Sequence, residues 1–224
     1  MSISKNALIV AMATLSPATA SAQSMFHGGP DHLGVYQSVA PSLSTVAWKF
    51  KTGGRVISSP LVVGDAVYVG TSDNNLYSIN RADGTLRWKF ATKGAVNSSP
   101  AFADGVVYVN SNDGSFYAVD AATGKEKWSF KTRGEHRFTA PGIHGRQPST
   151  EMMPDVFDMF LSSPAIASGI VYFGSGDGNV YALDAASGGL KWKFKTGNVV
   201  HASPAVSNGV VFIGSWDRNM YAID

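Results

Sequence analysis

The segment Ser98–Thr132, SSPAFADGVVYVNSNDGSFYAVDAATGKEKWSFKT, holds one complete unit of a pattern that the 224-residue chain repeats. A Ser-Pro pair stands near its start and a tryptophan near its end. Both features recur at one constant interval, except for a longer interval between the third and fourth tryptophan and between the second and third proline. The tryptophans are Trp48, Trp88, Trp128 and Trp192, and the prolines are Pro60, Pro100, Pro164 and Pro204. A fixed period of about 40 residues indicates a solenoid or a propeller.

Four short strands fit within each unit. The first follows the Ser-Pro pair, and the second is apolar throughout, as in Val106–Val109. Such a run is typical of a strand buried on both faces. The third strand carries a tyrosine, as in Phe116–Val119, and the fourth carries the tryptophan, as in Trp128–Phe130. Four strands in each repeat, with no helix-length segment between them, predict an all-β propeller built from four-stranded antiparallel blades.

The residues Ala118–Trp128, AVDAATGKEKW, resemble the tryptophan-docking motif Ala-x-Asp-x-x-Thr-Gly-x-x-x-Trp of the quinoprotein-type (PQQ-like) β-propeller repeats. Ala182–Trp192 keeps most of that motif, and Ser78–Trp88 keeps its glycine and tryptophan. The repeat is also similar to that of the propeller lipoproteins of outer-membrane assembly. The resemblance implies that one tryptophan of each blade docks on a neighbouring blade, a structural role for Trp48, Trp88, Trp128 and Trp192.

The repeats predict about four blades, of which the last has no outer strand, because Ala222–Asp224 are only the opening of a docking motif. Three arrangements satisfy this pattern. The chain is a fragment of a seven- or eight-bladed ring, or Trp48 supplies the missing strand and closes a ring of four blades, or a second chain completes the ring. An arc of four blades left open would expose two apolar sheet faces, larger than soluble monomers tolerate.

The segment 1–22 has the pattern of a secretory signal. Lys5 precedes the apolar run Ala7–Leu15, and Ala20-Ser21-Ala22 form a small-residue cleavage site. The expected organisation is therefore a signal peptide at 1–22, a lead-in segment at 23–46 and repeats at 47–224. We expect a periplasmic or secreted protein, with no transmembrane segment in this chain, because no later apolar run has the length of a spanning helix.

Composition narrows the classes of function. The chain has no cysteine, so it has no disulfide, cysteine nucleophile or lipid-modified cysteine. Its formal net charge is only +2, whereas a nucleic-acid-binding domain carries a concentrated basic face. We therefore expect no nucleic acid partner.

An insertion at 133–160 accounts for the long interval between repeats. It lies in the link between an outer strand and the next inner strand, so we expect an ordered flap over the channel mouth, with a short helix from Pro154 to Phe160. The candidate ligand- or partner-binding residues are His136, Arg137, His144, Arg146, Asp155, Asp158, His201 and Trp216. The arginines are suited to a carboxylate or phosphate, and His144 with the two aspartates to a metal. The alternative is that these charges only cap loops and hold the flap by salt bridges.

One aspartate recurs in the turn between the second and third strand of every repeat. These residues are Asp73, Asp113, Asp177 and Asp217. Two readings apply: ordinary turn chemistry, since two of them precede glycine, or a ring of carboxylates for calcium or a cationic ligand. Trp216, beside Asp217, would either pack or stack on a ligand.

These observations support an exported, non-catalytic binding scaffold without a cofactor, which presents its channel face and flap to a protein, peptide or small-molecule ligand. The alternative is a partial dehydrogenase that uses pyrroloquinoline quinone and calcium, with its catalytic residues missing from this chain. The enzymes that the repeat resembles have a vicinal cysteine pair and a Glu-Asn-Asp calcium set, neither of which can be placed here. A third class is the sensor portion of a membrane receptor.

Overall fold

Each repeat forms one antiparallel sheet in the computed structural model, which describes residues 25–33, 45–133, 137–139, 152–154 and 161–224. The first sheet consists of β1 (Leu61–Val63), β2 (Ala66–Gly70), β3 (Asn75–Asn80) and β4 (Leu86–Ala91). The second consists of β5 (Ala101–Ala103), β6 (Val106–Ser111), β7 (Ser115–Asp120) and β8 (Glu126–Lys131). The third consists of β11 (Ala165–Ala167), β12 (Ile170–Gly174), β13 (Asn179–Asp184) and β14 (Leu190–Lys195). The fourth has three strands, β15 (Ala205–Ser207), β16 (Val210–Gly214) and β17 (Met220–Ile223).

The predicted all-β architecture of antiparallel blades is confirmed. The strand order in every sheet is sequential, so each blade is a meander from its inner to its outer strand. Tight turns make this order possible: Asp104 and Gly105 join β5 to β6 with φ values of 50° and 76°. Two successive positive φ angles match the twist of a hairpin, and Asp-Gly adopts them readily.

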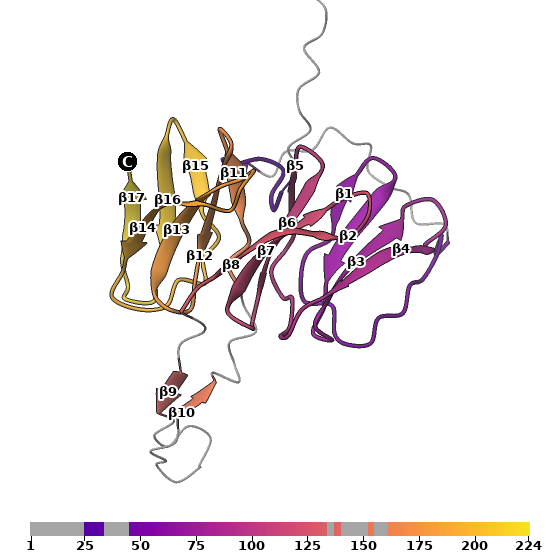
Figure 1. The fold of residues 1–224 in the computed structure, drawn as a ribbon, viewed down its shortest axis with the longest axis horizontal. Helices are drawn as coiled ribbons and strands as arrows, with labels where there is room; N and C mark the ends of the chain where they lie inside the picture. The colour runs from indigo at the N-terminus through magenta and orange to yellow at the C-terminus, as the bar shows by residue number, and fades with distance from the viewer. Residues whose placement is uncertain (1–24, 34–44, 134–136, 140–151, 155–160) are drawn as a thin grey trace, which may run out of the picture.

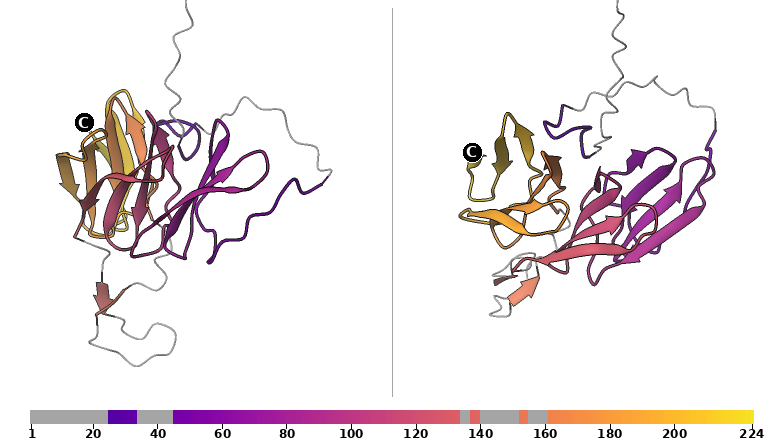
Figure 2. Two further views of the ribbon diagram at one scale, coloured as in Figure 1. Left: turned by 45° about the vertical axis from the view of Figure 1, so that its right-hand side comes forward. Right: turned by 45° about the horizontal axis from the view of Figure 1, so that its top comes forward.

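The four blades stand side by side as an open arc (Figure 1). The first blade lies at one end of the arc and the fourth at the other, and the ring is not closed in any of the three views (Figures 1 and 2). Trp48 lies at the first blade, against Gly84, so the arrangement in which it completes the fourth blade of its own chain does not occur here.

Apolar side chains fill the space between adjacent blades. Phe116 of the second blade is fully buried and stacks on Phe173 of the third, with ring centroids 4.2 Å apart. Val107 and Val109, on the opposite face of the second blade, are also fully buried and pack with Leu76 of the first blade. The second strand of the blade is therefore covered on both faces, as its apolar run predicts.

The insertion contains a two-stranded sheet formed by β9 (Arg137–Thr139) and β10 (Met152–Pro154). These two strands lie below the arc in Figure 1, away from its two ends. The prediction of a helix beginning at Pro154 is wrong at that residue, because Pro154 ends β10 and pairs with Arg137. Residues 155–160 of that expected helix lie outside the described residues.

Candidate functional site

The innermost strands β1, β5, β11 and β15 line the axis of the arc, and a row of serines joins them just before each strand begins. The amide of Ser59 donates a hydrogen bond to Oγ of Ser99 at 2.9 Å. The amide of Ser99 donates in the same way to Ser163 at 3.0 Å, and that of Ser163 to Ser203 at 3.0 Å. We call this row the serine ladder. The prolines that follow have no amide hydrogen, so they leave no unpaired donor at the start of the strand.

The N-terminal segment 25–33 lies against these inner strands. The amide of Val206 in β15 donates to the carbonyl oxygen of Pro30 at 2.6 Å, and the amide of Ile166 in β11 donates to Sδ of Met25 at 3.5 Å. The Met25 side chain is only 2% exposed and belongs to the core cluster of the second and third blades. The axial face of the arc thus holds a turn-rich piece of polypeptide through backbone donors and an apolar anchor.

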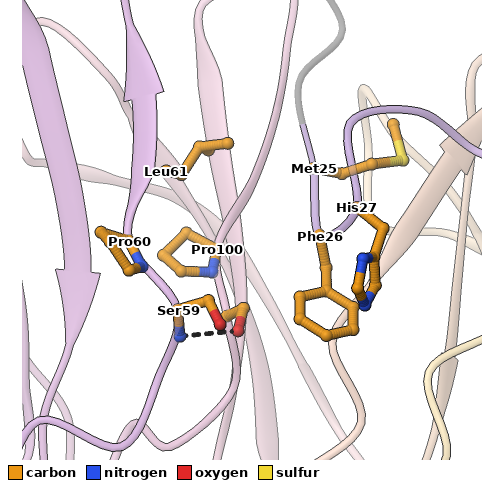
Figure 3. A pocket seen from close by; sticks show the side chains of 8 residues that line it. Met25, Phe26, His27, Ser59, Pro60, Leu61 and Pro100 are labelled. Carbon is orange, nitrogen blue, oxygen red and sulfur yellow. Dashed lines mark hydrogen bonds between the residues drawn. The ribbon is translucent and has the colours of Figure 1, made fainter. Parts of the chain in front are cut away.

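A cavity of about 200 Å³ separates this segment from the first two blades. Met25, Phe26 and His27 line one wall, while Ser59–Leu61, Ser99 and Pro100 line the other. Figure 3 shows the Phe26 ring and the two prolines facing each other across the space, with the Ser59–Ser99 hydrogen bond below. Ligand pockets for drug-sized molecules are usually larger, at roughly 300–1,000 Å³. The cavity is better suited to a side chain of a partner than to a whole cofactor.

The tryptophans lie between blades. The Trp88 indole donates to the carbonyl oxygen of Ala121 at 3.0 Å, and a Cβ on Gly124 would lie 2.7 Å from its ring. Trp128 makes the equivalent contacts with Ala185 and Gly188. Each indole therefore lies flat on the glycine turn of the next blade, where a larger residue would collide with it.

The repeated aspartates hold the links between blades. Asp177 accepts a hydrogen bond from the Tyr181 hydroxyl at 2.6 Å and one from the amide of Arg133 at 3.1 Å. Each of the other three aspartates accepts the same two hydrogen bonds. One comes from the hydroxyl of the tyrosine four residues later, and the other from an amide in the link that precedes the blade. The tyrosines are Tyr77, Tyr117 and Tyr221, and the link amides belong to Gly53, Lys93 and Gly197. These bonds are turn chemistry, and they use the carboxylate oxygens that a cation would require.

Protonation equilibria reflect these contacts. Burial opposes ionisation of Asp177, yet the hydroxyl of Tyr181 and the Asn179 side chain outweigh it, so its pKa lies below the ordinary value. On Asp217, the Tyr221 hydroxyl is the largest cause of a lowered pKa. Burial, followed by the hydrogen bond to Asp113, raises the pKa of Tyr117 to about 12. Asp177 and Asp217 are thus ionised and Tyr117 is protonated at neutral pH.

Only part of the predicted site falls within the described residues. His136, His144, Arg146, Asp155 and Asp158 lie outside them, and Arg137 lies in β9. His201 and Trp216 lie together: their rings meet edge to face with centroids 4.9 Å apart, and the indole is 56% exposed. The Trp216 amide donates to the carbonyl oxygen of Val199 in the link before β15. Both residues therefore lie on the face of the arc that carries the links and the insertion, which we call the link face.

Sequence reasoning missed the contribution of the N-terminal segment. Met25, Phe26 and His27 fall in what was expected to be only a lead-in, although all three line the axial cavity. The signal for them is weak: Met25-Phe26 is an apolar pair that follows the expected cleavage site after Gln23 and Ser24. Ser59 and Ser99 were recognised only as markers of the inner strand, whereas their side chains and amides form the serine ladder.

The meandering blades, the serine ladder and the tryptophans on the glycine turns define a protein of the β-propeller class. Residues 37–159 and 149–224 match a family described as outer membrane protein assembly factor BamB. The chain belongs to this family of PQQ-like repeats. No curated protein matches the chain in sequence.

Solved structures show the same fold. BamB from Moraxella catarrhalis is 19% identical with a TM-score of 0.61, and the match covers 80% of this chain and 49% of that one. The computationally designed Ika4 protein is 16% identical with a TM-score of 0.60, covering 81% of this chain and 100% of that one. Quinohemoprotein alcohol dehydrogenase ADHIIG from Pseudomonas putida is 23% identical with a TM-score of 0.57, covering 75% and 29%. The chain thus spans about half the length of the BamB structure.

Among the described residues, no helix has the length and apolar character needed to cross a membrane. In the same part of the chain, no three histidine or acidic side chains come close enough together to hold a metal ion.

Proposed function

We propose that this protein is an exported, non-catalytic scaffold that binds a protein or peptide partner at its axial and link faces. The observation that carries the proposal is the N-terminal segment, which binds to β11 and β15 through the carbonyl oxygen of Pro30 and the side chain of Met25. Backbone hydrogen bonds combined with a pocket for a side chain are a recurring way in which proteins recognise peptides. A side chain of a partner fits the axial cavity that remains between this segment and the first two blades.

The link face offers the second part of the surface. Trp216 is 56% exposed, and exposed aromatic side chains are typical anchors of protein interfaces. The insertion 133–160 begins on this face at Arg133, whose amide is held by Asp177. We propose that its histidines, arginines and aspartates contribute polar contacts around such an aromatic anchor. Membership of a family named for outer-membrane assembly supports a protein partner over a small molecule.

The alternative is a dehydrogenase that uses pyrroloquinoline quinone and calcium, because one similar structure is a quinohemoprotein alcohol dehydrogenase. The described residues do not fit that cofactor. Calcium takes six to eight oxygen ligands, whereas the repeated aspartates are separate and each already accepts from a tyrosine and a link amide. We therefore derive no catalytic step through a quinone.

Site-specific photocrosslinking in the cells that make the protein tests the scaffold. A photoreactive amino acid at Trp216, exposed on the link face, is expected to capture a partner. The same amino acid at Leu86 or Leu190, similarly exposed on outer strands, is the control and is expected to capture none. Capture at the outer strands alone, or alcohol oxidation by protein supplied with the quinone and calcium, would contradict the proposal. Sequencing the N-terminus of the purified protein tests export, with Gln23 as the expected first residue.

A further inference from the structure

A second cavity, of about 320 Å³, opens on the link face where the second blade leads into the third. Its walls carry three basic side chains together with a carboxylate and an amide. These residues are Arg133, Lys193, Lys195, Asp177 and Asn179, and we call the space between them the basic cavity. The second and third blades are complete four-stranded sheets, so neither end of the chain shapes this cavity. Its volume lies in the range of pockets that hold a ligand, roughly 300–1,000 Å³.

The strand register of the third blade brings the basic side chains together. Lys195 of β14 lies opposite Asn179 of β13, and Lys193 lies opposite Tyr181. Side chains two residues apart on a strand point to the same face of the sheet, so both lysines project from one face. Arg133, the first residue of the insertion, is fixed at the same corner, because its amide donates at 3.1 Å to the carboxylate in the turn between β12 and β13.

The one carboxylate in the basic cavity forms no ion pair with the three cations. Each oxygen of Asp177 already accepts two hydrogen bonds from uncharged donors, among them the Tyr181 hydroxyl and the Arg133 amide. Lys195 donates instead to the carbonyl oxygen of Asp177, at 2.7 Å. Among the described residues, no carboxylate lies within ion-pair distance of Lys193, Lys195 or the Arg133 guanidinium. The cavity therefore carries an excess of positive charge.

The charge of Arg133 acts on the same corner. Burial, followed by the hydrogen bond to Asp177, raises the pKa of Tyr181, and the positive charge of Arg133 opposes that rise. Coulombic effects weaken with distance, so the guanidinium lies near the Tyr181 hydroxyl. The cavity thus combines a buried amide, that of Asn179 at 6% exposure, with three exposed basic side chains.

The equivalent corners of the first two blades carry fewer basic residues. The three matching positions hold Gly53, Lys89 and Ala91 in the first blade, and Lys93, Ser129 and Lys131 in the second. Among the three four-stranded blades, only the third is basic at every position. The aspartate of the turn is held by a link amide in all of them, including the amide of Gly53. The additional cations of the third blade are therefore not needed to hold its turn.

We propose that the basic cavity binds an acidic segment of a partner protein, whose side-chain carboxylates pair with Arg133, Lys193 and Lys195. This inference rests on the proposed scaffold function and names the chemistry of its partner. A guanidinium binds a carboxylate through two parallel hydrogen bonds. The lysines are point charges on flexible stems, so they pair with acidic residues at more than one spacing along the segment.

The exposure of the three cations favours a peptide segment over a small anion. A pocket for a small molecule encloses most of the surface of its ligand, whereas the basic side chains here are exposed. A segment that lies across the cavity leaves its own backbone in water and places only its carboxylates among the cations. The formal net charge of the chain is only +2, so the concentrated basic face that binds nucleic acid is not available.

Fluorescence anisotropy with a labelled hexaglutamate peptide tests the site on the purified full chain. The expected result is saturable binding that weakens as salt screens the charges. The double variant Arg133→Gln with Lys193→Gln should raise the dissociation constant roughly 10-fold, because two exposed charge pairs are lost. Neither side chain makes a hydrogen bond to another described residue, so the variant is expected to fold. Circular dichroism of the variant checks this.

The matched control is Lys89→Gln with Lys125→Gln, which removes as much positive charge from exposed positions of the first two blades and should leave the dissociation constant unchanged. A hexaglutamine peptide is the uncharged probe and should not bind. Equal weakening by the two double variants, no saturable binding, or displacement of the peptide by an equal concentration of inorganic phosphate would overturn the proposal.

The result is separable from a test of the scaffold itself. Capture of a partner at Trp216 without any binding of hexaglutamate would leave the scaffold standing and overturn only the acidic segment. Binding of hexaglutamate that depends on Arg133 and Lys193, with no partner captured at Trp216, would support the basic cavity and count against the wider interface.

Discussion

The second and fourth blades come from the same repeat, yet they differ in what surrounds them. The second blade, β5–β8, has a neighbour on each side, and both Val107 and Phe116 are fully buried. The fourth, β15–β17, has a neighbour on one side, where Val211 is 1% exposed, while Phe212 and Met220 face outward. The difference shows that a blade of this kind does not make its own core. Its apolar side chains are buried only between sheets. The free energy of unfolding is therefore expected to be largely a sum of contributions from the interfaces between neighbouring blades.

The largest effect is expected when a side chain that is buried between two blades is shortened. Phe116→Ala should lower the free energy of unfolding by about 3–5 kcal/mol, since it leaves a cavity between two blades. Met220→Ala, at the same position of the fourth blade, should change it by less than about 0.5 kcal/mol. Urea unfolding measures both losses. Equal losses would contradict the view that burial comes from the neighbouring blade.

Substitutions at two glycines distinguish the cost of a collision with tryptophan from the cost of backbone strain. Gly188 and Gly209 both have positive φ, but a Cβ on Gly188 would lie 2.6 Å from the Trp128 ring, whereas a Cβ on Gly209 would meet nothing within 4 Å. Gly209→Ala should therefore cost only the backbone strain, about 1–2 kcal/mol. Gly188→Ala should cost at least about 1 kcal/mol more, because either the Trp128 indole must move or the second and third blades must separate. Thermal unfolding of the two variants measures both losses of stability. A smaller loss for Gly188→Ala than for Gly209→Ala would contradict the close contact between Gly188 and the Trp128 ring.

The tyrosine hydroxyls sharpen the comparison at the link face. Tyr181→Phe removes a 2.6 Å hydrogen bond to Asp177 in the third blade and should destabilise the protein by about 1.5–3 kcal/mol, the usual range for a bond to a charged group. Tyr221→Phe removes the same bond from Asp217 of the exposed fourth blade and should cost less, since water replaces the donor. Denaturant titration measures the two losses. A larger loss for Tyr221→Phe would indicate that the fourth blade is covered in solution.

The smallest effect is expected at alkaline pH. Because burial and the hydrogen bond to Asp113 raise the pKa of Tyr117 to about 12, its protonated form is favoured in the folded state. This contribution is complete below about pH 10, the ordinary tyrosine value, and is lost as the pH rises through about 12. Tyr117→Phe should flatten the fall of unfolding free energy over this interval. An unchanged slope would mean that other groups cause the fall.

Most of the fold was predictable from the sequence, and the reason lies in its repetition. The constant interval between tryptophans, the apolar second strands and the Asp-Gly turns each indicate the same meander, so one ambiguous strand is resolved by its copies. The missing outer strand of the fourth blade was predictable in the same way and is confirmed. Pro154 was misassigned because the insertion occurs only once in the chain. The preference of proline for the start of a helix could not be checked against a second copy of the insertion, and Pro154 instead pairs with Arg137 in a sheet.

The candidate site was less predictable, because its contacts join residues that no pattern relates. Nothing in the segment 25–33 repeats elsewhere, so the packing of Met25 against Ile166 has no copy from which to infer it. The proximity of His201 and Trp216 also depends on how a link and a turn meet in space. The serine ladder lies between these cases: the serines repeat visibly, but only the geometry of adjacent blades shows that one donates to the next.

The serine ladder is indifferent to how much chain separates its members. The bond from Ser99 to Ser163 bridges a much longer stretch of chain than the bond from Ser59 to Ser99, yet the two distances are 3.0 and 2.9 Å. Natural selection can therefore lengthen, shorten or replace a link without disturbing the blades on either side. For protein engineers, the insertion site after Arg133 is a ready position for grafting a foreign loop. The blades can therefore be conserved while the links between them change in length and sequence.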